Sequence, residues 1–209
     1  MINRLISFEG IDGSGKSTQI QMLCEKLDSL DIPHEAVREP GGTSISEKIR
    51  DILLDKNHLE LSPITESLLF LSARSQLSKE VIIPSLSDGK FVLCDRYTDS
   101  TLAYQGFGRG LDVKALDILN NYATQSTIPK LTFLFDIDLE TSIKRRDINT
   151  EDRMESSGIV FLKKVQYGYH QIESENKSRF KVIDGNRNPH EIFDEIWNVI
   201  QKNYKAIKR

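Results

Sequence analysis

The sequence has few cysteines and few histidines, which excludes several kinds of site at once. Of the 209 residues only Cys24 and Cys94 are cysteines. They lie far apart in apolar segments, so we interpret them as core residues of a protein in a reducing cytosol rather than as a disulfide or a metal-binding pair. The four histidines lack the spacing of metal ligands, so nothing indicates a histidine-based metal centre.

Long apolar runs and an excess of basic residues are also missing. No apolar stretch approaches the roughly 18 residues that cross a bilayer. Glu9 comes too early for the apolar core of a secretory signal. The formal net charge is −3, so no basic footprint indicates nucleic-acid binding. With 38% hydrophobic and 28% charged residues the composition is that of a globular protein, and we expect a cytoplasmic one without membrane or nucleic-acid partners.

Five short apolar runs have the character of buried strands. Most are nearly continuous in Val, Ile, Leu and Phe, which is typical of strands covered on both faces of a parallel sheet. The predicted strands are residues 4–9, 34–38, 90–95, 131–138 and 180–184.

Helical patterns separate these runs. One long pattern follows Ser62-Pro63, a helix cap with a first-turn proline, and the last one follows Asn188-Pro189. The predicted helices after the first one are residues 46–54, 62–86, 112–125 and 157–175, and a last one that begins near residue 189. Alternating strands and helices predict an α/β fold, a doubly wound five-stranded parallel sheet with helices on both faces. Residues 1–209 are predicted to form a single domain.

The most informative motif lies directly after the first predicted strand. It matches G-x-x-x-x-G-K-[ST], in which glycines let backbone N–H groups cradle phosphates. Lys16 supplies a positive charge near the β- and γ-phosphates, and the hydroxyl of Ser17 is a Mg²⁺ ligand. The alternative is an ordinary glycine-rich turn, but apolar residues at helical spacing follow the motif and favour a nucleoside triphosphate site. The predicted nucleotide-binding residues are Gly10, Ile11, Asp12, Gly13, Ser14, Gly15, Lys16, Ser17 and Thr18.

Two further segments end predicted strands and should lie at the same edge of the sheet. Arg38-Glu39-Pro40-Gly41-Gly42-Thr43 is either a Pro-Gly turn with solvated charges or part of the site. In Asp95-Arg96-Tyr97 the aspartate is suited to a Mg²⁺-bound water and the arginine to a phosphate. The alternative there is a structural salt bridge at the strand end.

Three other segments carry groups suited to a nucleotide. Phe70 and Arg74 lie four apart on one helix face, where they either belong to the core or receive a flat nucleobase. Residues 99–106 form a predicted polar loop, and its composition alone does not indicate a function. The charged run of residues 144–155 is either a solvated loop or part of a lid, predicted at about residues 144–157, whose arginines close over the phosphates.

Four segments together resemble thymidylate kinases of the bacterial kind. They are Phe8-Glu9-Gly10 with Lys16-Ser17-Thr18, the segment that begins at Arg38, Asp95-Arg96-Tyr97, and Ala103-Tyr104-Gln105-Gly106. The resemblance covers essentially the whole chain. It implies a P-loop kinase fold with a five-stranded parallel sheet, the use of ATP and Mg²⁺, conversion of dTMP to dTDP, and a homodimer.

The resemblance also implies roles for single residues. Phe70 matches a ring that stacks on thymine, and Arg74 matches an arginine that reads the base, with Thr101 and Gln105 nearby. Tyr104 resembles a tyrosine that crowds the 2′ position, and Asp12 a carboxylate near the 3′-hydroxyl. The residues matched to the acceptor phosphate are Arg38, Arg50 and Arg96, with Glu39 in the same segment and Asp95 near the magnesium.

Gly13 is a departure from eukaryotic members, which carry an arginine at this place in the glycine loop. The resemblance therefore implies that the arginine that acts in the transition state comes from the lid. The candidates are Arg145, Arg146 and Arg153, of which Arg153 is also matched to a contact with adenine.

Two other functions are compatible with the glycine loop. A deoxynucleoside kinase acts on a hydroxyl and calls for a base, and Glu39 or Asp95 is placed to serve as one. A nucleotide-dependent switch is less well supported, because the N-K-x-D string typical of GTPase switches is absent. The resemblance favours the monophosphate kinase over both.

Overall fold

In the computed structural model, which describes residues 3–58, 60–145, 153–154 and 157–204, five parallel strands form one sheet. Their order across the sheet is β2-β3-β1-β4-β5. The fold prediction is confirmed, and the strand ends differ from the predicted ones by at most two residues. The strands are β1 (Leu5–Glu9), β2 (His34–Arg38), β3 (Phe91–Asp95), β4 (Leu131–Asp136) and β5 (Phe180–Asp184).

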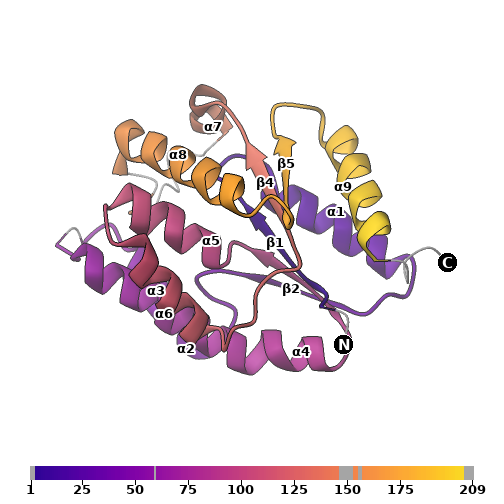
Figure 1. The fold of residues 1–209 in the computed structure, drawn as a ribbon, viewed down its shortest axis with the longest axis horizontal. Coiled ribbons are helices and arrows are strands. Elements are labelled where there is room, and N and C mark those ends of the chain that lie inside the picture. The colour runs from indigo at the N-terminus through magenta and orange to yellow at the C-terminus, as the bar shows by residue number, and fades with distance from the viewer. Residues whose placement is uncertain (1–2, 59, 146–152, 155–156, 205–209) are drawn as a thin grey trace.

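Helices cover both faces of the sheet, and each face has its own apolar core (Figure 1). Side chains alternate along β1, so that Ile6 and Phe8 point to one face and Leu5 to the other. On the first face, α1 (Lys16–Asp28) and α9 (Pro189–Asn203) pack side by side against the sheet. The other helices are α2 (Ser44–Leu54), α3 (Pro63–Leu77), α4 (Ile83–Ser87), α5 (Thr98–Thr101), α6 (Val113–Ala123), α7 (Leu139–Arg145) and α8 (Ile159–Glu175).

The predicted long helix 62–86 is interrupted. A π-helical segment, Ser78–Ile82, separates α3 from α4. Pro84 explains the interruption, because a proline lacks the N–H of a regular helix turn and its ring crowds the carbonyl four residues before. Phe70 and Arg74 lie before the interruption, on the regular helix α3.

The prediction of a polar loop at residues 99–106 is wrong. The segment is helical, first as α5 and then as a π-helical stretch, Leu102–Gly108, that packs closely against α8. Its polar residues are buried, and most of them are paired with partners from distant parts of the chain; Asp99, for example, forms an ion pair with Arg179 at 2.7 Å. Long-range partners of this kind leave no trace in the local sequence pattern.

The sheet order places a topological switch point at the centre of the molecule. The chain leaves β1 toward β2 on one side and returns, after β3, to β4 on the other. Ligands of open α/β sheets bind beyond the carboxyl ends of the strands at such a point. The glycine loop follows β1 there, and none of the described helices is long and apolar enough to cross a membrane.

Candidate active site

The glycine loop has the conformation that its sequence predicts. Gly10 and Gly13 have φ angles of 135° and 75°, which side chains disfavour. A Cβ at Gly10 would lie 2.6 Å from the carbonyl oxygen of Phe135, and one at Gly13 would lie 2.6 Å from that of Ser142. Both positions therefore require glycine, and the loop can curve closely around a ligand at the start of α1.

Lys16 begins α1 and points its ammonium group back into this loop. Its Nζ donates to the carbonyl oxygens of Gly10 and Ile11 at 3.1 and 3.0 Å. The side chain is buried, and burial, with the nearby positive charge of Arg96, lowers the pKa of Lys16. A polyphosphate at the loop would restore an opposite charge to this buried cation.

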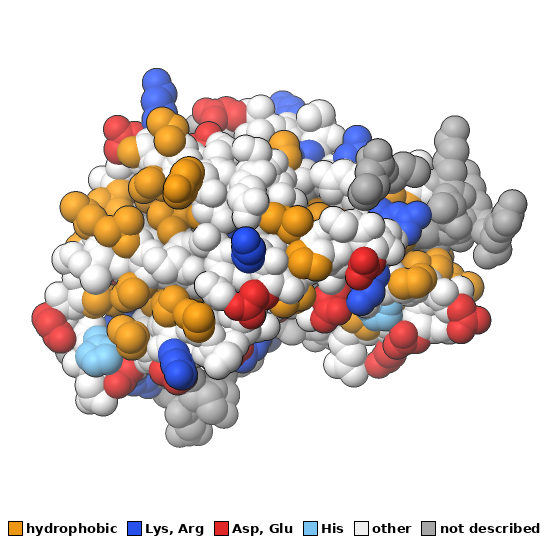
Figure 2. All heavy atoms as spheres, turned by 90° about the horizontal axis from the view of Figure 1, so that it is seen from below, with side chains coloured by type: hydrophobic (Ala, Val, Ile, Leu, Met, Phe, Trp, Pro, Cys, Tyr) orange, Lys and Arg blue, Asp and Glu red, His pale blue; other side chains and the backbone are white. Residues whose placement is uncertain are grey.

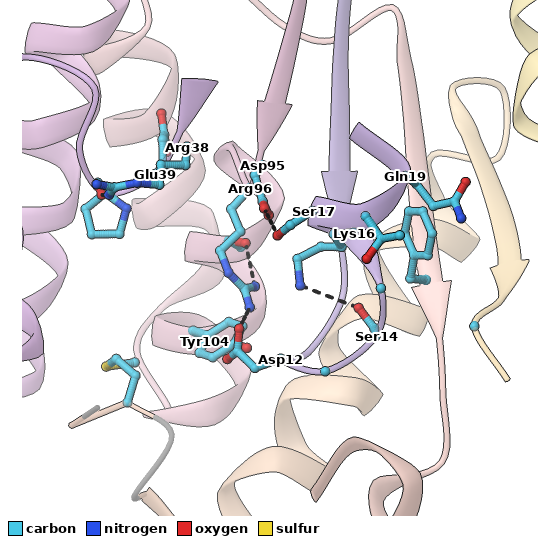
Figure 3. A pocket seen from close by; sticks show the side chains of 18 of the residues that line it. Asp12, Ser14, Lys16, Ser17, Gln19, Arg38, Glu39, Asp95, Arg96 and Tyr104 are labelled. Atoms are coloured by element: carbon cyan, nitrogen blue, oxygen red, sulfur yellow. Dashed lines mark hydrogen bonds and ion pairs between the residues drawn. The ribbon is translucent and has the colours of Figure 1, made fainter. Parts of the chain in front are cut away.

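Ser17 at the start of α1 and Asp95 at the end of β3 lie next to each other. The Ser17 hydroxyl donates to Oδ2 of Asp95 at 2.6 Å (Figure 3). Both side chains offer oxygen atoms, which Mg²⁺ prefers, and Mg²⁺ in such sites is completed by substrate phosphates and water rather than by a full protein cage. The described residues accordingly contain no group of three or more His, Cys, Asp or Glu that could hold a metal ion.

Arg96 reaches across the opening of the loop from an unusual backbone conformation. Its φ angle is 69°, in the left-handed region that a side chain disfavours. Nη1 donates to the carbonyl oxygen of Gly10 at 2.8 Å, Nη2 donates to Oδ1 of Asp12 at 2.6 Å, and the guanidinium lies over the Tyr104 ring. These contacts hold a fixed positive charge beside the glycine loop (Figure 3).

A buried carboxylate supports Arg96 from behind. Glu9, at the end of β1, accepts hydrogen bonds from the Tyr97 N–H at 2.8 Å and from the hydroxyls of Ser100 and Tyr169 at 2.6 and 3.0 Å. The same two hydroxyls lie 3.4 and 3.3 Å from Arg96 Nη1. Burial, with the negative charge of Asp99, raises the pKa of Glu9 to about 7.

The far end of the site is built on α3. Arg74 is buried; its Nε donates a hydrogen bond to Oε2 of Glu39 at 2.7 Å, and its Nη2 forms an ion pair with the same oxygen at 2.5 Å. Nη1 donates to Thr101 Oγ1 and to Asn120 Oδ1, both at 2.6 Å, and Nη2 also donates to the carbonyl oxygen of Tyr97. Arg74 thus donates four hydrogen bonds and forms one ion pair within the protein. It can read a base, as predicted, only by sharing a donor with one of these partners.

Thr101, Tyr104 and Gln105 line the cavity from α5 and the π-helical segment after it. Among the described residues, six buried side-chain polar atoms have no hydrogen-bond partner. Four of the six belong to residues that line this cavity: Gln19 Oε1, Glu39 Oε1, Tyr104 Oη and Arg187 Nε. Buried polar atoms without partners are costly, so their concentration here indicates that a ligand completes the site.

Two predicted phosphate-site arginines lie at the rim of the cavity. Arg38 forms an ion pair with Glu47 at 3.1 Å, and its side chain is half exposed. Arg50 donates from Nη1 to the carbonyl oxygen of Pro40 at 2.8 Å. The segment that begins at Arg38 is thus a turn that also lines the cavity, so the two interpretations of its sequence are compatible.

The predicted lid arginines are not all brought together. Arg145, at the end of α7, lines the cavity and donates to the carbonyl oxygen of Gly185 at 2.8 Å. Arg153 is buried instead and forms an ion pair with Glu66 at 2.7 Å. Arg146 lies outside the described residues, as do residues 147–152, 155 and 156 of the predicted lid.

One cavity of about 660 Å³ is lined by most of these groups, and its volume is within the range of small-molecule sites. The glycine loop and Phe70 both line it, and Arg96 lies beside the loop (Figure 3). All predicted site residues in the described part of the chain line it except Gly10, Ile11 and Arg153.

Sequence reasoning missed several residues that shape the site. Glu66 and Arg109 form an ion pair at 3.0 Å behind Gln105, and Tyr169 approaches the site from α8. Only Glu9, which supports Arg96, had a signal in the sequence: it is a glutamate at the end of a mostly apolar strand. Gly185 and Arg187, after β5, also line the cavity, and no motif marked them in the sequence.

Comparison with known proteins gives a consistent picture. A family model described as thymidylate kinase matches residues 8–196. A thymidylate kinase of Thermoanaerobacter sp. (strain X514) is 44% identical over 202 residues, which are 97% of this chain and 99% of that protein. One of Pelobacter propionicus is 46% identical over 198 residues, covering 91% of this chain and 90% of that protein.

A solved structure matches as well. The crystal structure of thymidylate kinase from Ehrlichia chaffeensis superposes with a TM-score of 0.76 at 34% sequence identity. The match covers 94% of this chain and 97% of that one, so the similarity extends over the sheet, the glycine loop and the helices that line the cavity.

Proposed function

The chain belongs to the thymidylate kinase family, and we propose that the cavity between the glycine loop and Phe70 is where it binds its two nucleotides. The enzyme transfers the γ-phosphate of ATP to dTMP, which gives dTDP for nucleotide biosynthesis. The observation that supports this location is the continuity of one cavity from a phosphate-binding loop to a ring on α3, with fixed cations between them.

ATP occupies the glycine-loop end in this proposal. The backbone N–H groups of residues 10–18 and the start of α1 hold its phosphates, and Lys16 neutralises the β- and γ-phosphate oxygens. The donor base lies toward Gly185 and Arg187, beside the Arg145 guanidinium. Ser17 and Asp95 hold Mg²⁺, which when bound neutralises phosphate charge and orients the γ-phosphate.

dTMP occupies the other end. Its thymine stacks on Phe70 and faces Thr101 and Gln105, and its phosphate lies toward the glycine loop, within reach of Arg96, Arg38 and Arg50. Tyr104 and Asp12, which both contact Arg96, are assigned to the sugar.

The reaction needs positioning and charge more than a base. A phosphate monoester has its second pKa near 6, so the acceptor phosphate is mostly a dianion at pH 7 and attacks without losing a proton. The protein must hold two anions in line and neutralise the charge on the group that moves. Lys16 and Arg96 provide two fixed cations at that place. Arg145, Arg146 and Arg153 remain the candidates for a third.

A homodimer is part of the proposal. α3 and α6 pack against each other and expose Ile64, Leu68, Ile118, Leu119 and Tyr122, whose exposed fractions range from 39 to 86%. Figure 2 shows hydrophobic side chains gathered on the left half of its view, the end where α3 and α6 lie in Figure 1. An apolar surface of this kind on a globular protein supports association with a second copy.

We also propose that residues 1–209 act as one kinase domain, with residues 144–157 as its arginine-bearing lid. The single sheet that carries both apolar cores supports the first part. The use of ATP as donor supports the predicted cytoplasmic location.

A substrate panel tests the activity, and one variant tests the site. ADP release is measured with ATP and dTMP, dUMP, dCMP, dGMP or thymidine; fast phosphorylation of thymidine with none of dTMP would refute dTMP as the acceptor.

Phe70→Ala removes the stacking ring and should raise the KM for dTMP about tenfold while leaving the KM for ATP unchanged. Tyr167→Ala, which removes an exposed ring outside the cavity, is the matched control. An unchanged KM in Phe70→Ala would place the thymine elsewhere.

A further inference from the structure

Glu66 is a buried carboxylate directly behind the thymine end of the cavity. It lies in the first turn of α3 with 1% of its surface exposed. Its Oε1 accepts hydrogen bonds from Gln105 Nε2 at 2.9 Å and Arg109 Nε at 3.1 Å. Its Oε2 accepts from Arg109 Nη2 at 3.0 Å and Arg153 Nη1 at 2.7 Å. Glu66 does not line the cavity itself, so any effect on a ligand passes through Gln105.

The charge state of Glu66 is fixed by its partners. Burial favours the neutral acid, but hydrogen bonds from Arg109, Gln105 and Arg153 outweigh it and lower the pKa of Glu66. At neutral pH the group is therefore a carboxylate, which accepts hydrogen bonds and donates none.

A carboxylate in this place determines which way the Gln105 amide faces. An amide has a donor end and an acceptor end, and only the NH₂ end can face an acceptor. Gln105 is itself buried and lines the cavity, and its Oε1 accepts no hydrogen bond from the described residues. The acceptor end is thus left for the ligand.

We propose that Glu66 is a positioning residue that makes Gln105 a hydrogen-bond acceptor toward the substrate base, and that it thereby favours thymine over cytosine. Thymine carries a proton on N3 and donates there, whereas cytosine has an unprotonated, accepting N3. An acceptor fixed opposite N3 pairs with thymine and faces a lone pair of cytosine. The inference rests on the proposed location of the thymine beside Phe70.

A charged neighbour also fixes the hydrogen bonding of Thr101, but it makes Thr101 a donor toward the ligand instead of an acceptor. Arg74 donates to Thr101 Oγ1 at 2.6 Å, and an arginine can only donate. The hydroxyl proton of Thr101 is therefore directed away from Arg74 and is available to a ligand acceptor, such as O4 of thymine. Arg74 thus makes Thr101 a donor, and Glu66 makes Gln105 an acceptor. The edge of thymine that carries O4 and N3–H requires this pair.

The test compares kcat/KM for dTMP and dCMP in the full-length enzyme. Glu66→Gln keeps the size of the side chain but can donate to Gln105, so the amide of Gln105 is free to reverse. We expect the ratio of dTMP to dCMP to fall about tenfold or more, with a rise in kcat/KM for dCMP. Glu66→Asp keeps an acceptor-only group and should keep the ratio within about threefold. Glu140→Gln, an exposed glutamate on α7, is the matched control.

A double-mutant cycle with Gln105→Leu distinguishes a specific effect from a loss of stability. If Glu66 acts through Gln105, Gln105→Leu alone lowers the ratio and Glu66→Gln lowers it no further in that background. Equal losses for dTMP and dCMP in Glu66→Gln, or an unchanged ratio in Gln105→Leu, would overturn the inference. Phe70→Ala separates this failure from a failure of the proposed site, because it tests the position of the base without involving Glu66.

Discussion

Glu9 gives a prediction whose size can be calculated from the structure. Its side chain is completely buried, and burial together with Asp99 raises its pKa from 4.5 to about 7. Between these two values the folded protein holds a proton that the unfolded chain has released. The free energy of unfolding therefore falls as the pH rises, because ionisation costs more in the folded state.

The magnitude follows from the difference of about 2.5 pKa units. Each unit corresponds to about 1.4 kcal/mol, so the full effect is about 3 kcal/mol. The stability contributed by the protonated form is complete below pH 4.5 and lost as the pH rises through 7. From pH 5 to pH 8 we expect a loss of about 2 to 3 kcal/mol from this one group.

Glu9→Gln removes the titration while it keeps the shape. Its amide oxygen can accept from the Tyr97 N–H, and the hydroxyls of Ser100 and Tyr169 can rotate to accept from its NH₂ group. Urea unfolding of both proteins from pH 5 to pH 8 isolates the group, because all other titrations cancel in the difference. As the pH rises from 5 to 8, the free energy of unfolding of the variant should increase by about 2 to 3 kcal/mol relative to that of the wild type. Parallel stability curves would refute the assignment of a raised pKa to Glu9.

Three further predictions concern the reaction and the assembly. Lys16→Ala should lower kcat about 10³-fold with both nucleotides saturating, measured by ADP release, and near-normal turnover would contradict the assignment. Asp95→Asn should raise the Mg²⁺ concentration for half-maximal activity about tenfold or more; an unchanged titration would remove Asp95 from the metal site. Ile118→Asp should shift the protein from dimer to monomer in sedimentation, with Val160→Asp as the control on α8, and an unaffected dimer would exclude this face.

Much of the fold could be predicted because its signals are local. Apolar runs, most of them nearly continuous, marked the five strands. Capping residues marked helix starts such as Ser62-Pro63, where the Ser62 hydroxyl accepts from the Thr65 N–H at 3.2 Å. The glycine loop was also readable from sequence, because its backbone conformation demands glycine at fixed positions. Where the local signal was mixed, as at residues 99–106, the prediction failed.

The partners of the site residues could not be predicted in the same way. Arg74 was matched to a residue that reads the base, yet in the structure it donates hydrogen bonds to Glu39, Thr101 and Asn120. These partners are 35, 27 and 46 positions away in the sequence. Glu66 had no motif at all, since its role depends on an arginine 43 positions later. Such groups become visible only when the chain is folded, because hydrogen bonds between distant side chains leave no periodic pattern.

The cations of the site are held in place before any phosphate arrives, and this has a consequence for catalysis. Lys16 rests on two carbonyl oxygens and Arg96 on Asp12 and the Gly10 carbonyl, so neither side chain must be ordered when the nucleotides bind. The backbone strain at Arg96 is borne by the folded protein rather than at binding. In the proposed site, a phosphate bound at the glycine loop would give Lys16 and Arg96 an anionic acceptor in place of backbone carbonyl oxygens, and both cations would already lie where negative charge develops. Preorganised charge of this kind lowers a barrier most in a site that excludes water. The arrangement of Lys16 and Arg96 is therefore suited to stabilising the negative charge that develops on a phosphoryl group during its transfer.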